Sequence, residues 1–153
     1  MNSKPKLLVI SAPSGSGKTT IARELLKRHP EILFSVSATT RAKREYETEG
    51  KDYFFLTKKQ FEDFIHQERL IEWEQIYGDY YGTLKSEVDK ALRAGKSMLF
   101  DIDVKGGLSI KRHYPQESLI IFIKPPSVEV LTERLTKRKT EDREWPHRRG
   151  RIA

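Results

Sequence analysis

The sequence predicts an α/β fold with a parallel core sheet flanked by helices. Three short apolar runs, at 7–10, 98–100 and 119–123, have the form of buried parallel strands. Segments with helical periodicity lie between them, as expected when helices connect parallel strands. Open sheets of this kind bind ligands beyond the carboxyl ends of their strands, so we expect the functional residues to follow these runs.

Composition narrows the class of protein. The chain of 153 residues is long enough for one domain, and 37% apolar content suffices for a core. Zero cysteines exclude disulfides and thiolate metal sites, and no stretch approaches the ~20 apolar residues of a membrane helix. The net charge of +7 suits an anionic ligand, and nucleotides and nucleic acids both qualify. Four arginines lie in the tail at 143–151, so the charge is not evidence for nucleic acid. We expect a soluble, cytoplasmic protein with no membrane or nucleic-acid partner.

The segment LLVISAPSGSGKTT at 7–20 joins a predicted strand to a predicted helix and has the form of a phosphate loop. Its glycines let backbone N–H groups converge on a polyphosphate at the start of the helix. Lys18 would reach the β- and γ-phosphates, and Thr19 would ligate the magnesium ion that bridges them. The predicted ATP-binding residues are Ala12, Pro13, Ser14, Gly15, Ser16, Gly17, Lys18 and Thr19.

One position departs from the phosphate-loop pattern, since Ala12 stands where the first glycine belongs. A methyl group is tolerable there if the backbone keeps a negative φ. The alternative is a turn that only connects a strand to a helix. The strand before it and the GKT at the helix start favour the phosphate loop.

The next segments form a less regular region. The first helix is predicted from about 18 to 29, with Ile21 and Leu25 among its inward residues. Residues 34–41 alternate apolar and hydroxyl side chains, as a half-exposed strand does. The charged, turn-rich stretch 41–52 is predicted to be a mobile surface loop.

A strand at 53–56 leads into a predicted helix of about 57–67. Thr57 and Gln60 have the spacing of a capping box, which marks the start of that helix. Its apolar residues recur at the spacing that places them on one inward face.

Residues 70–82 mix aromatic and polar positions with glycines, which indicates short antiparallel strands. Such strands would expose Glu72, Tyr80 or Tyr81 to a groove. The stretch 83–94 is predicted to be helical, because its apolar residues recur at helical spacing.

The apolar run at 98–100 delivers two carboxylates, Asp101 and Asp103, where open sheets bind ligands. For Asp103, the alternative is that its side chain caps a helix. The run at 119–123 is predicted to be a further buried strand.

The last predicted helix begins after Ser127. That residue caps it, and Val128, Leu131 and Leu135 face inward. Basic side chains follow its outer side, and such a face is often merely solvated. These basic residues are Arg134, Lys137 and Arg138.

Taken together, the motifs resemble the guanylate kinase family from the phosphate loop to residue 140. They are, in order, APSGSGKTT, FSVSATTRAKR, GKDYFF, LIEWEQIYGDYYGT, LFDIDVKGG and FIKPPSVEVLTERLTKR. The resemblance implies a P-loop NTPase kinase fold with a small GMP-binding lobe and a lid. It places the core at 1–33 and 84–125, the lobe at 34–83, a partial lid at 126–145 and an atypical tail at 142–153.

The resemblance implies transfer of the γ-phosphoryl group of ATP to GMP, giving ADP and GDP in purine metabolism, with Mg²⁺ as cofactor. Guanine offers its N1–H and N2–H₂ donors to one carboxylate, and the resemblance assigns that carboxylate to Glu72. The implied GMP-binding residues are Ser37, Arg41, Arg44, Tyr53, Glu72, Tyr81, Thr83, Asp101 and Asp103. The implied catalytic residues are Lys18, Arg134 and Arg138, and the implied magnesium ligands are Thr19 and, as a further candidate, Asp101.

Other readings stay open at this point. One is a guanylate-kinase-like interaction module without catalysis, which the intact phosphate loop argues against. Another is a related P-loop kinase for a different phosphorylated acceptor, which Glu72 argues against. A third is an inactive fragment.

The sequence departs from the family at Lys105, where glutamine is usual, at Lys139, where glycine is usual, and in the tail. Family members continue with a lid, a long helix and a last strand, so we expect a truncated or out-of-frame product. The run at 119–123 would then be an unpaired apolar edge. We expect such a chain to aggregate and to be less active than one with a complete family C-terminus.

Overall fold

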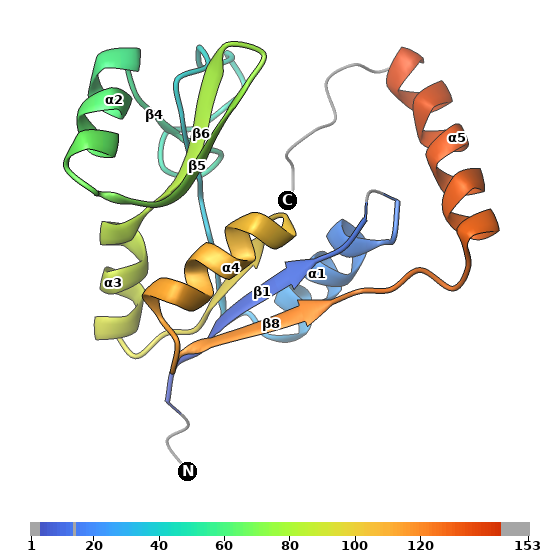
Figure 1. Ribbon diagram of the computed structural model, residues 1–153, viewed down its shortest axis with the longest axis horizontal. Coiled ribbons are helices and arrows are strands. Elements are labelled where there is room, and N and C mark those ends of the chain that lie inside the picture. The colour runs from blue at the N-terminus through green and yellow to red at the C-terminus, as the bar shows by residue number, and fades with distance from the viewer. Residues whose placement is uncertain (1–3, 14, 145–153) are drawn as a thin grey trace.

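The computed structural model describes residues 4–13 and 15–144, with side chains of the last helix to residue 137 (Figure 1). It has a parallel sheet with helices on both faces, a second sheet above it and a long C-terminal helix to one side. The predicted α/β class with a parallel core is confirmed. Within the described part of the chain, no helix is long and apolar enough to cross a membrane.

The parallel sheet runs in the order β2, β7, β1, β8 among the described residues. Leu7 is in register with Met98 on one side and with Ser118 on the other, so β1 is flanked by a strand on both sides. The strands are β1 (Leu7–Ser11), β2 (Leu33–Phe34), β7 (Met98–Asp101) and β8 (Ser118–Phe122).

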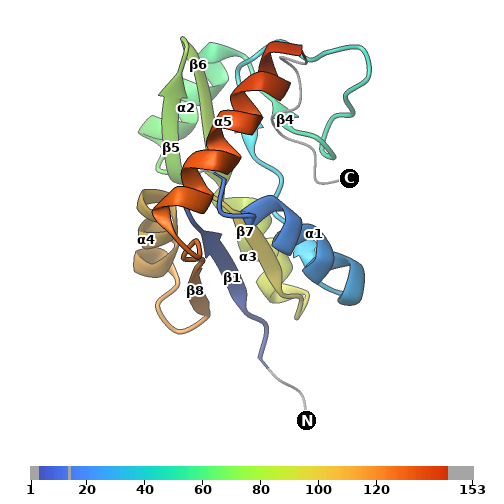
Figure 2. The ribbon, with the colours of Figure 1, turned by 90° about the vertical axis from the view of Figure 1, so that its right-hand side faces the viewer.

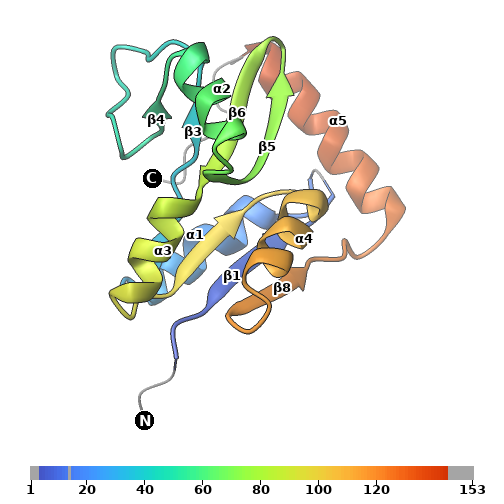
Figure 3. The same ribbon diagram turned by 60° about the vertical axis from the view of Figure 1, so that its left-hand side comes forward.

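Helices cover both faces of this sheet. On one face, α1 (Lys18–Arg28) packs Ala22 against Ile10 and Leu99. The opposite face is covered by α3 (Lys85–Arg93) and α4 (Val104–His113). Figure 3 shows β1 between α1 and α4.

Glycine allows the close approach of α4 to the sheet. A Cβ on Gly107 would lie 3.0 Å from Cγ1 of Val9, which is tighter than ordinary packing. The first turn of α4 therefore lies directly over the strand that leads into the phosphate loop.

The second sheet has the strand order β4, β3, β6, β5. A hairpin of β5 and β6 closes through Tyr77 and Gly78, both at positive φ (51° and 87°). Its strands are β3 (Ala38–Thr39), β4 (Phe54–Phe55), β5 (Leu70–Ile76) and β6 (Asp79–Leu84).

Helix α2 (Lys58–His66) covers the second sheet. It begins at the predicted capping box, with Thr57 accepting from the Gln60 N–H and the Gln60 side chain accepting from the Thr57 N–H. Phe61 is fully buried and stacks on Tyr80 with ring centroids 5.1 Å apart. The predicted antiparallel strands of this region are confirmed.

Several sequence predictions need correction. Ile21 is 45% exposed, and Ala22 takes the inward position because α1 is turned by about one residue. The stretch 34–41 is divided, with Phe34 in the parallel sheet and Ala38 in the second sheet. Helix α3 begins at Lys85, so the first two residues of the predicted helix belong to β6.

The strand predicted at 119–123 is β8, and among the described residues it is the unpaired apolar edge expected from the departure in the tail, not a strand buried on both sides. Leu119, Ile121 and Phe122 are 51%, 40% and 56% exposed. Sheet order explains the difference, because the described residues place a neighbouring strand on one side of β8 alone.

Helix α5 (Val128–Glu144) follows β8 and runs along the molecule toward the second sheet (Figure 2). The Ser127 hydroxyl accepts from the backbone N–H of Val130, as predicted for a cap. The prediction that Val128 faces inward is wrong, since this side chain is 74% exposed. Trp145 and the rest of the predicted tail lie outside the described residues.

Candidate active site

The phosphate loop occupies the space between β1 and α1. Gly15 and Gly17 have φ values of 85° and 88°, a region that other residues rarely adopt, so glycine is required for this turn. The hydroxyl groups of Ser11 and Ser16 are buried and have no hydrogen-bond partner among the described residues. Buried polar atoms normally find a partner, so these two hydroxyls are consistent with a site that takes a polar ligand. Ser14 lies outside the described residues.

Asp101 contacts the side chains of Lys18 and Thr19, the first two residues of α1. The Nζ atom of Lys18 lies 3.0 Å from Oδ1 of Asp101, and the hydroxyl of Thr19 donates to Oδ2 at 3.4 Å. Strand β7 ends at Asp101 beside β1, so sheet pairing brings together groups far apart in the sequence. A cation, a hydroxyl and a carboxylate thus meet at the carboxyl end of the parallel sheet.

Asp103 has a structural contact that the sequence analysis gave as an alternative. Its side chain accepts from the backbone N–H of Gly106 at 2.7 Å and caps α4. A Cβ on Gly106 would lie 3.5 Å from Oε2 of Glu72, so the first turn of α4 lies beside Glu72 of the second sheet.

Glu72 lies on β5 with one carboxylate oxygen held by a hydroxyl. The Oγ1 atom of Thr83 donates to Oε1 of Glu72 at 2.7 Å, whereas Oε2 has no hydrogen-bond partner among the described residues. Burial raises the pKa of the Glu72 carboxyl above its ordinary value. The hydrogen bond from Thr83 opposes that increase, and the charges of Glu74 and Asp103 add to it.

Gly82 makes the close pairing of β5 and β6 beside Glu72 feasible. A Cβ on this residue would lie 2.7 Å from the backbone oxygen of Glu72 and 3.0 Å from Cβ of Trp73. No other residue fits there without moving the strand that carries Glu72. The sequence analysis did not single out Gly82, although a glycine inside a strand is a known signal of close backbone approach.

Arg41 is paired with a carboxylate in the loop after β3. Its Nη2 atom lies 2.6 Å from Oε1 of Glu47, and its Nη1 atom lies 3.1 Å from Oε2. The backbone N–H of Arg44 donates to the same carboxylate, and the Arg44 side chain donates to the hydroxyl of Tyr46. The predicted surface loop is therefore tied together by a buried ion pair.

Two tyrosines stand beside Arg41. The rings of Tyr53 and Tyr81 meet edge to face with centroids 6.1 Å apart, and the guanidinium carbon of Arg41 lies 5.3 Å from the Tyr53 centroid. Burial raises the pKa of the Tyr53 hydroxyl, which therefore stays protonated and can donate a hydrogen bond. The arrangement offers cationic and phenolic donors from β6 and from the loop between β3 and β4.

Ser37 precedes β3, at the start of the second sheet. Its carbonyl oxygen accepts from the backbone N–H of Phe54, and its side chain is half-buried. The backbone bond fixes Ser37 between the two sheets.

Helix α5 contacts the phosphate loop from the other side. Nη1 of Arg134 donates to the carbonyl of Gly15 at 3.4 Å. Side-chain atoms of Leu131 and Leu135 lie 3.3–3.4 Å from where a Gly15 Cβ would be. The side chain of Arg138 lies outside the described residues.

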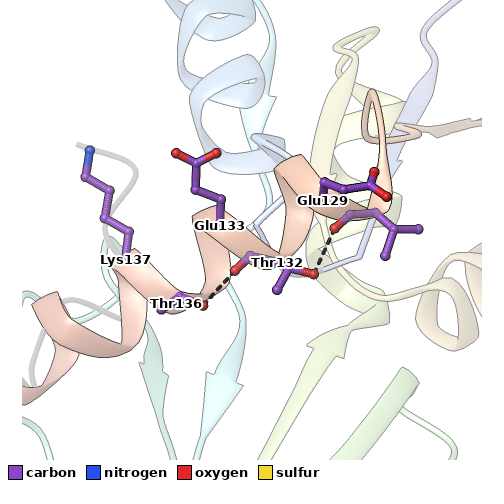
Figure 4. Close-up of a pocket in the computed structure, with 6 residues that line it drawn as sticks. Glu129, Thr132, Glu133, Thr136 and Lys137 are labelled. Atoms are coloured by element: carbon purple, nitrogen blue, oxygen red, sulfur yellow. Dashed lines mark hydrogen bonds between the residues drawn. The ribbon is translucent and has the colours of Figure 1, made fainter.

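Exposed residues of α5 line a shallow, open pocket on the surface (Figure 4). Two threonines there bond to the helix itself, since Thr132 donates to the carbonyl of Val128 and Thr136 to that of Thr132. The lining residues are Val128, Glu129, Thr132, Glu133, Thr136 and Lys137, none of them a predicted site residue.

The sequence model of the guanylate kinase family matches residues 4–149. The chain belongs to this family. It is 50% identical over 139 residues to guanylate kinase of Chlorobium luteolum, a match covering 91% of this chain and 71% of that protein. It is 53% identical to guanylate kinase of Chlorobium chlorochromatii, covering 90% of this chain and 72% of that protein.

A solved structure agrees with the sequence relatives. The crystal structure of guanylate kinase from Anaplasma phagocytophilum superimposes with a TM-score of 0.66 at 33% sequence identity. The match covers 94% of this chain and 73% of that one. This guanylate kinase family member therefore has a P-loop kinase fold, and the family supports a nucleoside monophosphate kinase function.

Two residues of the candidate site were not predicted from the sequence. Glu47 looks like one charge among many in a charged loop, and no periodicity marks it as buried. Gly82 could have been predicted, because a glycine inside a strand indicates close approach of another backbone segment. Lys105, which departs from the family pattern, is exposed on α4, and the side chain of Lys139 lies outside the described residues.

Proposed function

We propose that this protein transfers the γ-phosphoryl group of ATP to GMP, giving ADP and GDP. The observation that carries the proposal is the half-satisfied carboxylate of Glu72, with one oxygen on Thr83 and the other without a partner among the described residues. Guanine presents N1–H and N2–H₂ side by side, and a carboxylate accepts from both. Adenine presents an acceptor there and would leave the carboxylate unpaired.

The acceptor phosphate is assigned to the group around Arg41. A guanidinium offers paired N–H donors that match phosphate oxygens, and phenols add directional donors. The proposed phosphate-binding residues are Arg41, Arg44, Tyr53 and Tyr81, and the proposed residues beside the base are Ser37, Glu72 and Thr83.

The donor is assigned to the phosphate loop. The backbone N–H groups of residues 12–19, except Pro13, which has none, would hold the ATP phosphates, and Lys18 would leave Asp101 to neutralise the transferring group. Arg134 on α5, which donates to the Gly15 carbonyl, would add positive charge from the far side of the loop. Arg138 is proposed for the same role from the family resemblance alone.

The chemistry needs no nucleophile from the protein. A phosphate oxygen of GMP attacks the γ-phosphorus, and the bond to the β–γ bridging oxygen breaks, so ADP leaves. The protein aligns the two phosphates and stabilises their charge, because alignment and electrostatics supply most of the acceleration in such reactions.

Thr19 and Asp101 fit a magnesium ion bound with ATP. Hydroxyl and carboxylate oxygens are ligands that Mg²⁺ prefers, and their contact at 3.4 Å places both at the phosphate loop. Within the described part of the chain, no three His, Cys, Asp or Glu residues gather to hold a metal ion. Thr19 and Asp101 would therefore share the ion with ATP phosphates and water. When bound, Mg²⁺ neutralises charge on the β- and γ-phosphates.

A coupled assay of ADP release tests the proposal. ATP and magnesium are supplied with GMP, AMP, UMP or no acceptor. We expect GMP to stimulate ADP release far above the other conditions. Equal stimulation by AMP would reject Glu72 as the base-reading residue, and release independent of any acceptor would reject the phosphotransferase function. The predicted cytoplasmic location stays a prediction.

A further inference from the structure

Glu47 lies in the loop between β3 and β4 and is 8% exposed. A carboxylate buried to this extent needs a charged partner or hydrogen bonds. Glu47 has both, because Arg41 holds its two oxygens and the backbone N–H of Arg44 donates to Oε2 at 2.8 Å. Burial alone would raise the pKa of Glu47, but these contacts outweigh it and hold that pKa below its ordinary value.

The carboxylate occupies one edge of the Arg41 guanidinium and leaves the other open. A guanidinium can form paired bonds to an oxyanion along its Nη1–Nη2 edge or along its Nε–Nη2 edge. Glu47 takes the first edge, and Nη1 also donates to the carbonyl of Ala42 at 2.8 Å. Neither Glu47 nor Ala42 takes the Nε–H or the second Nη2–H, and the hydroxyl of Tyr53, itself a proposed phosphate ligand, also lies within hydrogen-bonding reach of Arg41.

Two aromatic rings lie close to the guanidinium group of Arg41. The Cζ atom of Arg41 lies 5.3 Å from the ring centroid of Tyr53 and 5.9 Å from that of Phe55. With one edge on a carboxylate and rings beside its plane, the guanidinium has a defined orientation. Its open edge shares this environment with Tyr53 and Tyr81, whose rings are in contact.

We infer that Glu47 is a positioning residue, which turns the open edge of Arg41 toward the phosphate of the acceptor nucleotide. The inference rests on the proposed function, since it takes that acceptor to be GMP. Glu47 itself does not touch the substrate. It acts by fixing which donors of Arg41 remain available to a phosphate.

The effect of neutralising Glu47 distinguishes orientation from simple charge. A negative charge close to a bound phosphate repels it, so charge alone predicts that Glu47→Gln binds GMP more tightly. Orientation predicts the opposite, because the amide of glutamine would turn a donor toward the donors of Arg41 and Arg44. The sign of the change therefore decides between the two.

The experiment measures binding of GMP and of guanosine by calorimetry, in the parent and in two variants. We expect Glu47→Gln to weaken the affinity for GMP about tenfold or more. The affinity for guanosine, which has no phosphate, should stay unchanged. Glu45→Gln removes the same charge from an exposed neighbour and is expected to change neither affinity. Unchanged or tighter GMP binding by Glu47→Gln overturns the inference, as does an equal loss of guanosine binding.

A double substitution tests whether Glu47 acts through Arg41. Arg41→Lys removes the fork, so adding Glu47→Gln to it is expected to cause little further loss of GMP affinity. Additive losses would show that Glu47 acts by another route and would overturn the inference. ATP binding and a melting curve report folding for each variant. If the Glu47→Gln variant does not fold, Glu47→Asp replaces it, because its carboxylate is one methylene further from Arg41. We expect this variant to bind GMP more weakly and to bind guanosine as the parent does.

The activity of the parent protein shows whether the proposed function fails or only the role of Glu47 fails. Absence of GMP-dependent ADP release in the parent rejects the proposed function and this inference with it. A parent that phosphorylates GMP, beside a Glu47→Gln variant of unchanged GMP affinity, rejects the role of Glu47 alone.

Discussion

The donor side and the acceptor side of this molecule are built in different ways. On the donor side, the phosphate-binding groups are consecutive residues between β1 and α1, and one distant carboxylate, Asp101, meets them. On the acceptor side, the candidate groups come from the residue before β3, the loop between β3 and β4, β5 and β6. A contiguous loop depends on local backbone geometry, whereas the second sheet must pair correctly before its groups converge.

We expect the largest effect from removing the positive charge of Lys18 on the donor side. Lys18→Ala should lower turnover by about 100- to 1,000-fold, because a positive charge aimed at the transferring group is lost. GMP affinity, measured by calorimetry, should stay close to that of the parent, since Lys18 belongs to the other half of the site. Lys27→Ala, an exposed lysine at the far end of α1, is the control and should leave turnover unchanged. Near-parental turnover in Lys18→Ala would remove the phosphate loop from the mechanism.

The matching change on the acceptor side is Glu72→Gln. The new amide presents a donor to the guanine donors, so GMP affinity should fall by about 10- to 100-fold while ATP affinity is nearly unchanged. Titration calorimetry with each nucleotide measures both. Glu74→Gln, at an exposed position on the same strand, serves as the control. Equal losses for ATP and GMP would mean that the two halves are not independent.

A smaller effect should appear in the pH dependence of base binding. Burial raises the pKa of Glu72 above its ordinary value, and the carboxyl must be ionised to accept from guanine. Guanosine affinity should therefore be constant above the raised pKa and fall as the pH is lowered through it, at a higher pH than for an exposed glutamate. Guanosine is the probe because the phosphate of GMP titrates near pH ~6. The fall should be absent in Glu72→Gln.

The two sheets also differ at their edges, and this gives the smallest expected effect. The outward backbone groups of Ile120 and Phe122 on β8 are unpaired among the described residues, whereas Lys111 covers the carbonyl of Ser118. Leu119→Lys should reduce concentration-dependent self-association, because charge at a strand edge opposes edge-to-edge pairing.

Sedimentation velocity over a range of protein concentrations measures this association. Leu108→Lys, at a similarly exposed apolar position on α4, is the control and should leave it unchanged. If both substitutions act equally, general surface hydrophobicity and not the β8 edge is responsible.

The same contrast explains which features the sequence predicted. The phosphate loop, the capping box at Thr57 and the β5–β6 hairpin depend on residues close together in the chain, and the sequence predicted each of them. The prediction that Ile21 faces inward is wrong, because neighbouring elements decide whether Ile21 or Ala22 is buried. The exposure of β8 depends on strand order, which no local pattern contains.

The acceptor side shows most clearly which contacts the sequence alone cannot predict. Glu72 and Arg41 followed from the family resemblance, but the burial of Glu47 depends on how a turn-rich loop folds back on Arg41. Glutamate in a charged loop is ordinarily solvated, so composition points away from this ion pair. Only the three-dimensional arrangement identifies it.

The pairing of β1 has a consequence for the order of folding. Leu7 pairs with Met98 and Ser118, so β1 is synthesised well before the distant segments that flank it. The β5–β6 hairpin, closed by Tyr77 and Gly78, can form as soon as it is synthesised. The acceptor side can therefore begin to fold while β1 is still an unpaired apolar segment, a condition in which a nascent chain is prone to aggregate.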